Sequence, residues 1–159
     1  MMRHFGGLPL LDRAIYPGDD YNYPRETIEK TVNFIVNLCN EAASVLPWQT
    51  SAEEDGRFTK AAALGLKVRV LLFAASPLFN DNQPYLDGEA SSNLMVWYGN
   101  KSEQRWQDVV DACKEFEQAN STDSYKYELV ETGNYRQDFQ DAWYKSCLLY
   151  TSPSPRDAH

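Results

Sequence analysis

The stretch GRFTKAAALGLKVRVLLFAASPLFN, from Gly56 to Asn80, indicates the fold class of this 159-residue chain. Gly56 favours a turn, Thr59 is suited to cap a helix, and the alanine-rich run that follows ends at Pro77. Its larger apolar residues recur at three- and four-residue steps: Leu64, Val68, Leu71 and Leu72. Because small side chains let a helix lie close to its neighbours, we predict a helix over residues 60–75 that serves as packing scaffold.

A second helix is predicted upstream, over residues 27–45. Thr27 is its expected N-cap, and Glu29 lies favourably near the positive end of the helix. Its apolar stripe consists of Ile28, Val32, Ile35, Cys39, Ala42 and Leu46. An acidic turn over residues 51–56 leads into the alanine-rich helix, so we predict that the two helices form an antiparallel hairpin.

A third helix is predicted downstream, from Ser102 or Glu103 to about Ala119, with Ser102 as a natural cap. One face of it carries Trp106, Val109, Val110, Cys113 and Phe116. With three helices and no strand pattern of comparable strength, the sequence predicts a mainly all-α fold.

The connection between the second and third of these segments, residues 77–101, is longer than compact domains usually leave without a function. It combines aromatic rings, which can stack on the C–H faces of sugars, with amide and carboxylate groups that can bind hydroxyls. Our candidate ligand-binding residues are Trp97, Tyr98, Tyr85, Asn80 and Asp81. The alternative is that Trp97 and Tyr98 only fix the loop to the scaffold.

Composition excludes several classes of protein. The formal net charge of −8 argues against nucleic acid as a partner, because a phosphate backbone is bound by basic surfaces. With 43% hydrophobic and 13% aromatic residues the chain is expected to fold. No run approaches the roughly 20 apolar residues that a membrane-spanning helix needs.

Catalytic and metal-binding patterns are also missing from the sequence. The carboxylates at residues 19–20 and 53–55 fall in polar turns, where solvation is a better explanation than a raised pKa. His4 is the only histidine apart from His159 at the end of the chain, and no nucleophile or phosphate-binding motif occurs. We therefore expect no catalytic residues, no metal and no cofactor.

Four blocks in the same order resemble the SusD/RagB family of outer-membrane glycan-binding lipoproteins. The central block resembles "GR.TK.AA..LK.R..L..ASPLFN". The others are residues 5–11 ("YGGVPL"), residues 25–47 ("R.T.E....I..DL..A...LP") and residues 106–129 ("W..A..A.......Y.L"). Asn37 departs from the family, which usually has an aspartate there, and the loop between Asn80 and Trp106 is of a kind that varies in length.

The resemblance implies a function that neither composition nor periodicity indicates. It implies tetratricopeptide-like helical hairpins and a non-catalytic protein that is held at the cell surface of the outer membrane by a lipid anchor absent from this chain. Its partners would be an oligosaccharide or other glycan and a TonB-dependent SusC-like transporter. The alternative is a helical-repeat scaffold that binds a protein partner and no sugar.

The ends of the chain lead to a further expectation. Residues 147–157 resemble the translation of a common sequencing adapter, so we expect residues 147–159 to be an artefactual tail. Residues 1–146 would then be a fragment of a SusD-like helical domain, truncated at both ends.

Overall fold

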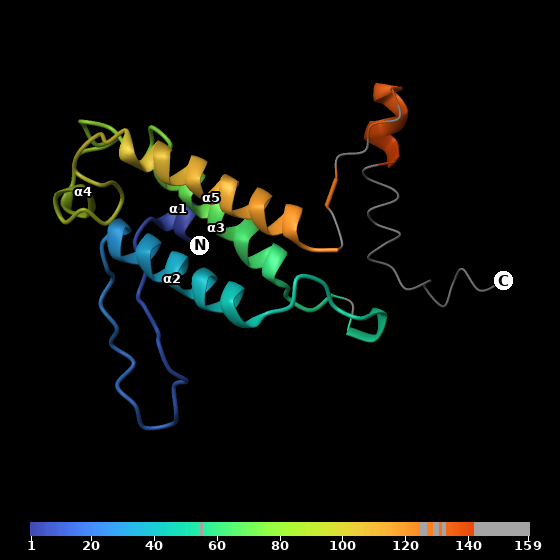
Figure 1. The fold of residues 1–159 in the computed structure, drawn as a ribbon. Helices are drawn as coiled ribbons and strands as arrows, with labels where there is room; N and C mark the ends of the chain where they lie inside the picture. Colours follow the sequence, from blue (N-terminus) through green and yellow to red (C-terminus); the bar gives the residue numbers. More distant parts are fainter. Residues whose placement is uncertain (55, 125–126, 129–130, 132, 142–159) are drawn as a thin grey trace.

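The computed structural model describes residues 1–54, 56–124, 127–128, 131 and 133–141. The elements in order are α1 (Met2–Phe5), α2 (Ile28–Val45), the 3-10 helix η1 (Ala52–Glu54), α3 (Lys60–Ala75), α4 (Glu89–Ser92) and α5 (Gln104–Thr122) (Figure 1). No strand occurs in the part of the chain that the structure describes, which confirms the mainly all-α prediction. The expected tail, residues 147–159, lies outside the described residues.

The three long helices α2, α3 and α5 form one layer, with α3 in contact with both of the others (Figure 1). The two predicted caps are present. Thr27 accepts a hydrogen bond from the backbone N–H of Lys30 at 3.3 Å, and Thr59 accepts one from Ala62 at 3.2 Å. Each cap satisfies a donor that the first helical turn leaves unpaired, so local sequence is sufficient to start both helices.

The apolar core has two clusters, one near each end of the helix pair. The first joins α2 to α3 and the loop: Met2, Ile28, Val32, Val70, Ala74 and Phe79. The second lies around the connection between the two helices: Ala43, Trp48, Ala61, Ala63 and Leu64. Alanines of α3 contribute to both clusters, Ala74 to the first and Ala61 and Ala63 to the second, as expected for a helix whose neighbours approach closely.

The predicted stripe on α3 was only partly right. Leu64 is buried, but Leu72 is 48% exposed and Val68 is half-buried, whereas Val70 is buried. The reason is that α3 contacts helices on two sides. A helix of this kind is apolar around most of its circumference, and its three- and four-residue spacing no longer identifies the buried face.

The start of α5 also differs from the prediction. The helix begins at Gln104, and Glu103 is the N-cap residue without a side-chain cap hydrogen bond. Ser102 therefore lies one residue before the N-cap, where its backbone N–H and carbonyl are bound to the side chain of Asn80. The buried residues Val109 and Ala112 define the inner face, so Trp106 and Val110, expected on that face, remain 40% and 46% exposed.

A polar contact connects all three long helices. The ammonium group of Lys67 on α3 donates to the side-chain oxygen of Asn40 on α2 at 2.8 Å and to the carboxylate of Glu115 on α5 at 2.6 Å. The Lys67 side chain is only 14% exposed, so this ion pair is less screened by solvent than an ordinary surface pair. It fixes the relative positions of the helices across the middle of the layer.

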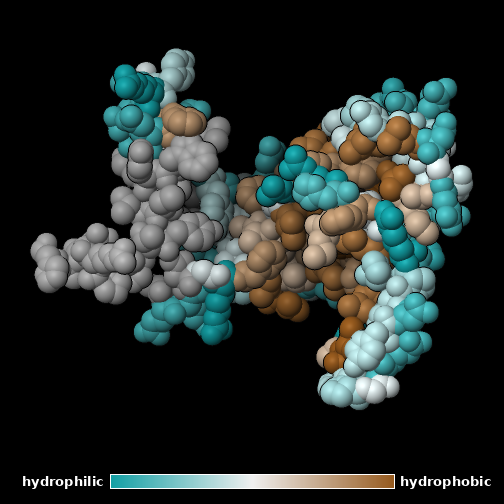
Figure 2. Space-filling model, turned by 180° about the vertical axis from the view of Figure 1, so that it is seen from behind, coloured by the Kyte–Doolittle hydropathy of each residue, from teal (hydrophilic) through white to brown (hydrophobic). Residues whose placement is uncertain are grey.

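Apolar side chains also remain on the surface of this layer, where Figure 2 shows hydrophobic atoms over the helical part of the molecule. Those at least 40% exposed on the long helices are Leu38, Val45, Leu66, Leu72, Trp106 and Val110. Within the described residues no helix has the length and apolar character needed to cross a membrane.

Candidate functional site

The loop of residues 77–101 is held against the N-terminal segment by backbone contacts. The Met95 carbonyl accepts a hydrogen bond from the N–H of Gly7, and the Leu94 carbonyl accepts one from Ile28 at 3.0 Å. Gly6 follows α1 with a φ of 72°, and a Cβ at this position would overlap the Met95 carbonyl oxygen. The loop and α1 therefore approach one another as closely as a glycine backbone permits.

Asn80 joins the end of α3 to the start of α5. Its amide nitrogen donates to the carbonyls of Ala75 at 3.3 Å and Ser102 at 3.0 Å. Its side-chain oxygen accepts from the Ser102 N–H at 2.7 Å and from the guanidinium of Arg105 at 2.6 Å. Asn80 is 3% exposed, so the amide predicted to contact a ligand is fully occupied by protein groups.

Tyr98 belongs to the same framework. Its ring packs against the core cluster of α2 and α3, and the Arg105 guanidinium lies 3.9 Å from its ring centroid. Burial raises the pKa of the Tyr98 phenol to about 12, with the Arg105 charge opposing part of that shift. The packing matches the alternative in which Tyr98 fixes the loop to the scaffold.

The raised pKa of Tyr98 predicts a specific loss of stability at alkaline pH. The folded state favours the neutral phenol, so its contribution is complete below the ordinary pKa of 10.0 and is lost as the pH rises toward about 12. Over this pH range the free energy of unfolding of Tyr98→Phe should fall less steeply than that of wild type. The two losses of stability should differ by up to about 3 kcal/mol. Urea denaturation of both proteins at several alkaline pH values measures it, and parallel pH profiles would contradict the assignment.

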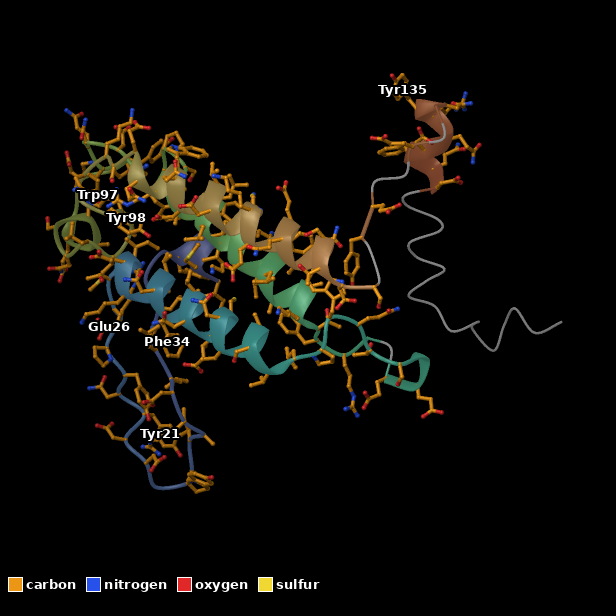
Figure 3. The ribbon with its side chains drawn as sticks, viewed as in Figure 1. Tyr21, Glu26, Phe34, Trp97, Tyr98 and Tyr135 are labelled. Atoms are coloured by element: carbon orange, nitrogen blue, oxygen red, sulfur yellow. The ribbon has the colours of Figure 1, made fainter. Side chains whose placement is uncertain are left out.

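The other two aromatic candidates line one pocket. Trp97 is half-buried, and its indole N–H donates to the backbone carbonyl of Ser91 at 2.9 Å, whereas Tyr85 is 82% exposed. Both border a pocket of about 480 Å³ between α1 and the loop. Figure 3 shows Trp97 and Tyr98 at the same end of the helical layer. Asp81 does not line the pocket, and its carboxylate accepts from the N–H of Asn82 at 2.7 Å.

Several lining residues of this pocket were absent from the sequence-based set. They are Arg3, His4 and Phe5 from α1, and Leu78, Leu86, Asp87 and Glu89 from the loop. The α1 residues lie about eighty positions before the loop, and no local pattern connects the two segments. The Gly-Gly pair of residues 6–7 was the available signal, because paired glycines often mark a close backbone approach.

The pocket wall offers both apolar and charged groups. It combines aromatic and aliphatic groups with one guanidinium, one imidazole and two carboxylates, and the four residues that carry these polar groups are exposed. Among the described residues no group of three or more histidine, cysteine or acidic side chains is placed to hold a metal ion. A second pocket of about 470 Å³ lies near the opposite end of the layer, between α3 and α5 and beside Trp48.

The chain matches no family model and no curated protein. It does match solved structures. BT4246 is 30% identical with a TM-score of 0.67 over 87% of this chain and 24% of that one, and selenomethionine BT4246 is 31% identical with a TM-score of 0.63 over 86% and 23%. A SusD-like protein (BF3747) from Bacteroides fragilis NCTC 9343 is 24% identical with a TM-score of 0.62 over 93% and 22%. This chain thus spans about a quarter of the length of each of these structures.

Proposed function

We propose, from the fold that the chain shares with BT4246 and with a SusD-like protein, that it is part of a SusD-like, non-catalytic glycan-binding component of a nutrient-uptake system. The proposed ligand is an oligosaccharide and the proposed partner is a TonB-dependent SusC-like transporter, at the surface of the outer membrane. The observation that supports sugar binding best is the pocket that Tyr85 and Trp97 line at one end of a SusD-like fold.

The composition of this pocket fits the surface of a sugar. Pyranose rings present flat C–H faces that pack on aromatic rings, and hydroxyls that need hydrogen-bond acceptors and donors. Tyr85 and Trp97 provide the rings, while Asp87 and Glu89 provide exposed carboxylate acceptors. Because these carboxylates are exposed to solvent, we propose that they act as hydrogen-bond acceptors and take no part in breaking the glycosidic bond. The affinity would then come from stacking and hydrogen bonds.

A panel of oligosaccharides tests this function directly. We expect the purified protein to bind at least one of maltohexaose, xylohexaose or mannohexaose in isothermal titration calorimetry, with no release of reducing sugar on prolonged incubation. Absence of binding to all three, and to hexagalacturonate as an acidic glycan, would contradict the proposal. Release of reducing ends would instead indicate a hydrolase.

A second candidate function is a scaffold for a protein partner. The observation in its favour is the set of exposed apolar side chains on the long helices, including Val45 at 79% and Leu72 at 48% exposure. The two candidates differ in their response to sugar. Under the scaffold function a saturating oligosaccharide leaves Tm unchanged, whereas a ligand that binds only the folded protein raises it.

A further inference from the structure

We infer that the pocket between α1 and the loop binds a neutral sugar ring against Tyr85 and Trp97, and that its acidic margin discriminates against anionic glycans. This inference rests on the proposed glycan-binding function and specifies both the site and the class of ligand. It also extends the site beyond the loop, because α1 contributes part of the wall.

The size and the apolar part of the pocket favour a ring-shaped ligand. Its volume of about 480 Å³ lies within the range of roughly 300–1,000 Å³ that is typical of small-molecule sites. Phe5, Leu78 and Leu86 line it together with the two aromatic candidates. These apolar groups can cover the C–H face of a pyranose but give no hydrogen bonds, so polar recognition falls to the margin.

The rings of Trp97 and Tyr85 have different roles in this site. The Trp97 indole N–H is already bound to the Ser91 carbonyl, which orients the indole and leaves it no N–H for a ligand. Tyr85 is 82% exposed, an unusual degree for a large aromatic side chain beside an apolar pocket. Tyr85 is thus the ring that a ligand can cover with the largest gain in buried area.

The charged groups around the pocket favour a neutral ligand. Asp87 and Glu89 are exposed, and neither forms a salt bridge within the described residues. Of the basic groups in the lining, His4 is exposed and the Arg3 guanidinium lies 5.1 Å from the centroid of the Phe73 ring. With two carboxylates against the single guanidinium of Arg3, the lining keeps a net negative charge in a chain of net charge −8. It should therefore repel uronates and sulfates, while the carboxylates accept hydrogen bonds from neutral hydroxyls.

The pocket is also preformed, because α1 and the loop are joined by the backbone contacts of Gly6 and Gly7 with Met95. The Arg25 guanidinium donates in addition to the carbonyls of Phe5 and Gly7. A site whose two walls are fixed before binding loses less conformational entropy when the ligand arrives.

The experiment compares Tyr85→Ala with wild type by calorimetry on the neutral hexaose that binds, and on hexagalacturonate. Loss of the stacking ring should weaken neutral binding by about tenfold, which corresponds to about 1.4 kcal/mol. Tyr135→Ala is the matched control, because Tyr135 is 90% exposed and lies away from the loop (Figure 3), and its affinity should equal that of wild type. Trp97→Phe keeps a ring without the indole N–H and should retain most of the affinity.

The charge part is tested by the double variant Asp87→Asn, Glu89→Gln at low ionic strength, where screening is weak. It should bind hexagalacturonate at least about threefold more tightly than wild type does. Wild-type preference for hexagalacturonate over every neutral hexaose would overturn the charge part. Neutral binding unaffected by Tyr85→Ala would overturn the pocket assignment and leave glycan binding intact, whereas no binding of any glycan would overturn the proposed function itself.

Discussion

Gly6→Ala should destabilise the protein by about 2–6 kcal/mol. The residue has a φ of 72°, a backbone angle that residues with a Cβ rarely adopt because it costs them about 1–3 kcal/mol. The added methyl group would also overlap the carbonyl oxygen of Met95, and such overpacking costs about 1–3 kcal/mol more unless the loop moves away. Urea denaturation at neutral pH measures the change in free energy of unfolding.

Gly65→Ala is the matched control for this substitution. Gly65 lies inside α3, its φ is not positive, and a Cβ there would meet no atom within 4 Å. Alanine should therefore stabilise the helix by about 0.5–1 kcal/mol, the usual gain from removing a glycine within a helix. Equal effects of the two substitutions would show that close packing of the N-terminal turn against the loop does not contribute to stability.

Asn80→Ala is expected to have the second large effect, a destabilisation of about 2–4 kcal/mol. The substitution leaves the carbonyls of Ala75 and Ser102 and the Ser102 N–H without the partners they have at the junction of α3 and α5. Burial prevents water from replacing these bonds fully, so much of the desolvation cost remains. Thermal and urea denaturation should agree on the loss.

Two further variants define the origin of that effect. Asn82→Ala is the control, because Asn82 is exposed and its side chain accepts from the Lys101 N–H at 3.2 Å, so its loss should cost less than about 1 kcal/mol. Asn80→Asp keeps the acceptor for Ser102 and Arg105 but puts an oxygen opposite two carbonyls, and it should be about as unstable as Asn80→Ala. A stable Asn80→Ala would contradict the framework role of this side chain.

Local sequence was sufficient for the helices, because the interactions that start them lie within a few residues. Thr27 and Thr59 cap their helices through N–H groups three positions ahead, as the sequence predicts. The apolar spacing likewise indicated where all three long helices run. It failed for the faces of α3 and α5, since burial there depends on which neighbours contact the helix.

The candidate site shows the same limit more clearly. The sequence identified an aromatic, polar loop, but it could not distinguish ligand-binding residues from structural ones among Tyr85, Trp97, Tyr98 and Asn80. The structure separates them: Asn80 and Tyr98 are bound within the framework, while Tyr85 and Trp97 border the pocket. Whether an amide or an aromatic ring is exposed to solvent depends on groups distant in the chain, such as Arg105 in the case of Asn80. A local sequence pattern contains no information about such groups.

The amino-acid sequence thus specified a helical chain with the SusD-like order of elements, since capping, periodicity and turn residues act over short distances. The pocket itself depends on tertiary structure. Its walls come from α1 and from a loop about eighty residues later, and they meet because Gly6 and Gly7 let two backbones approach within hydrogen-bonding distance. Contacts between segments so far apart in the chain form only when the intervening helices pack, and this is why the site could not be read from any single segment.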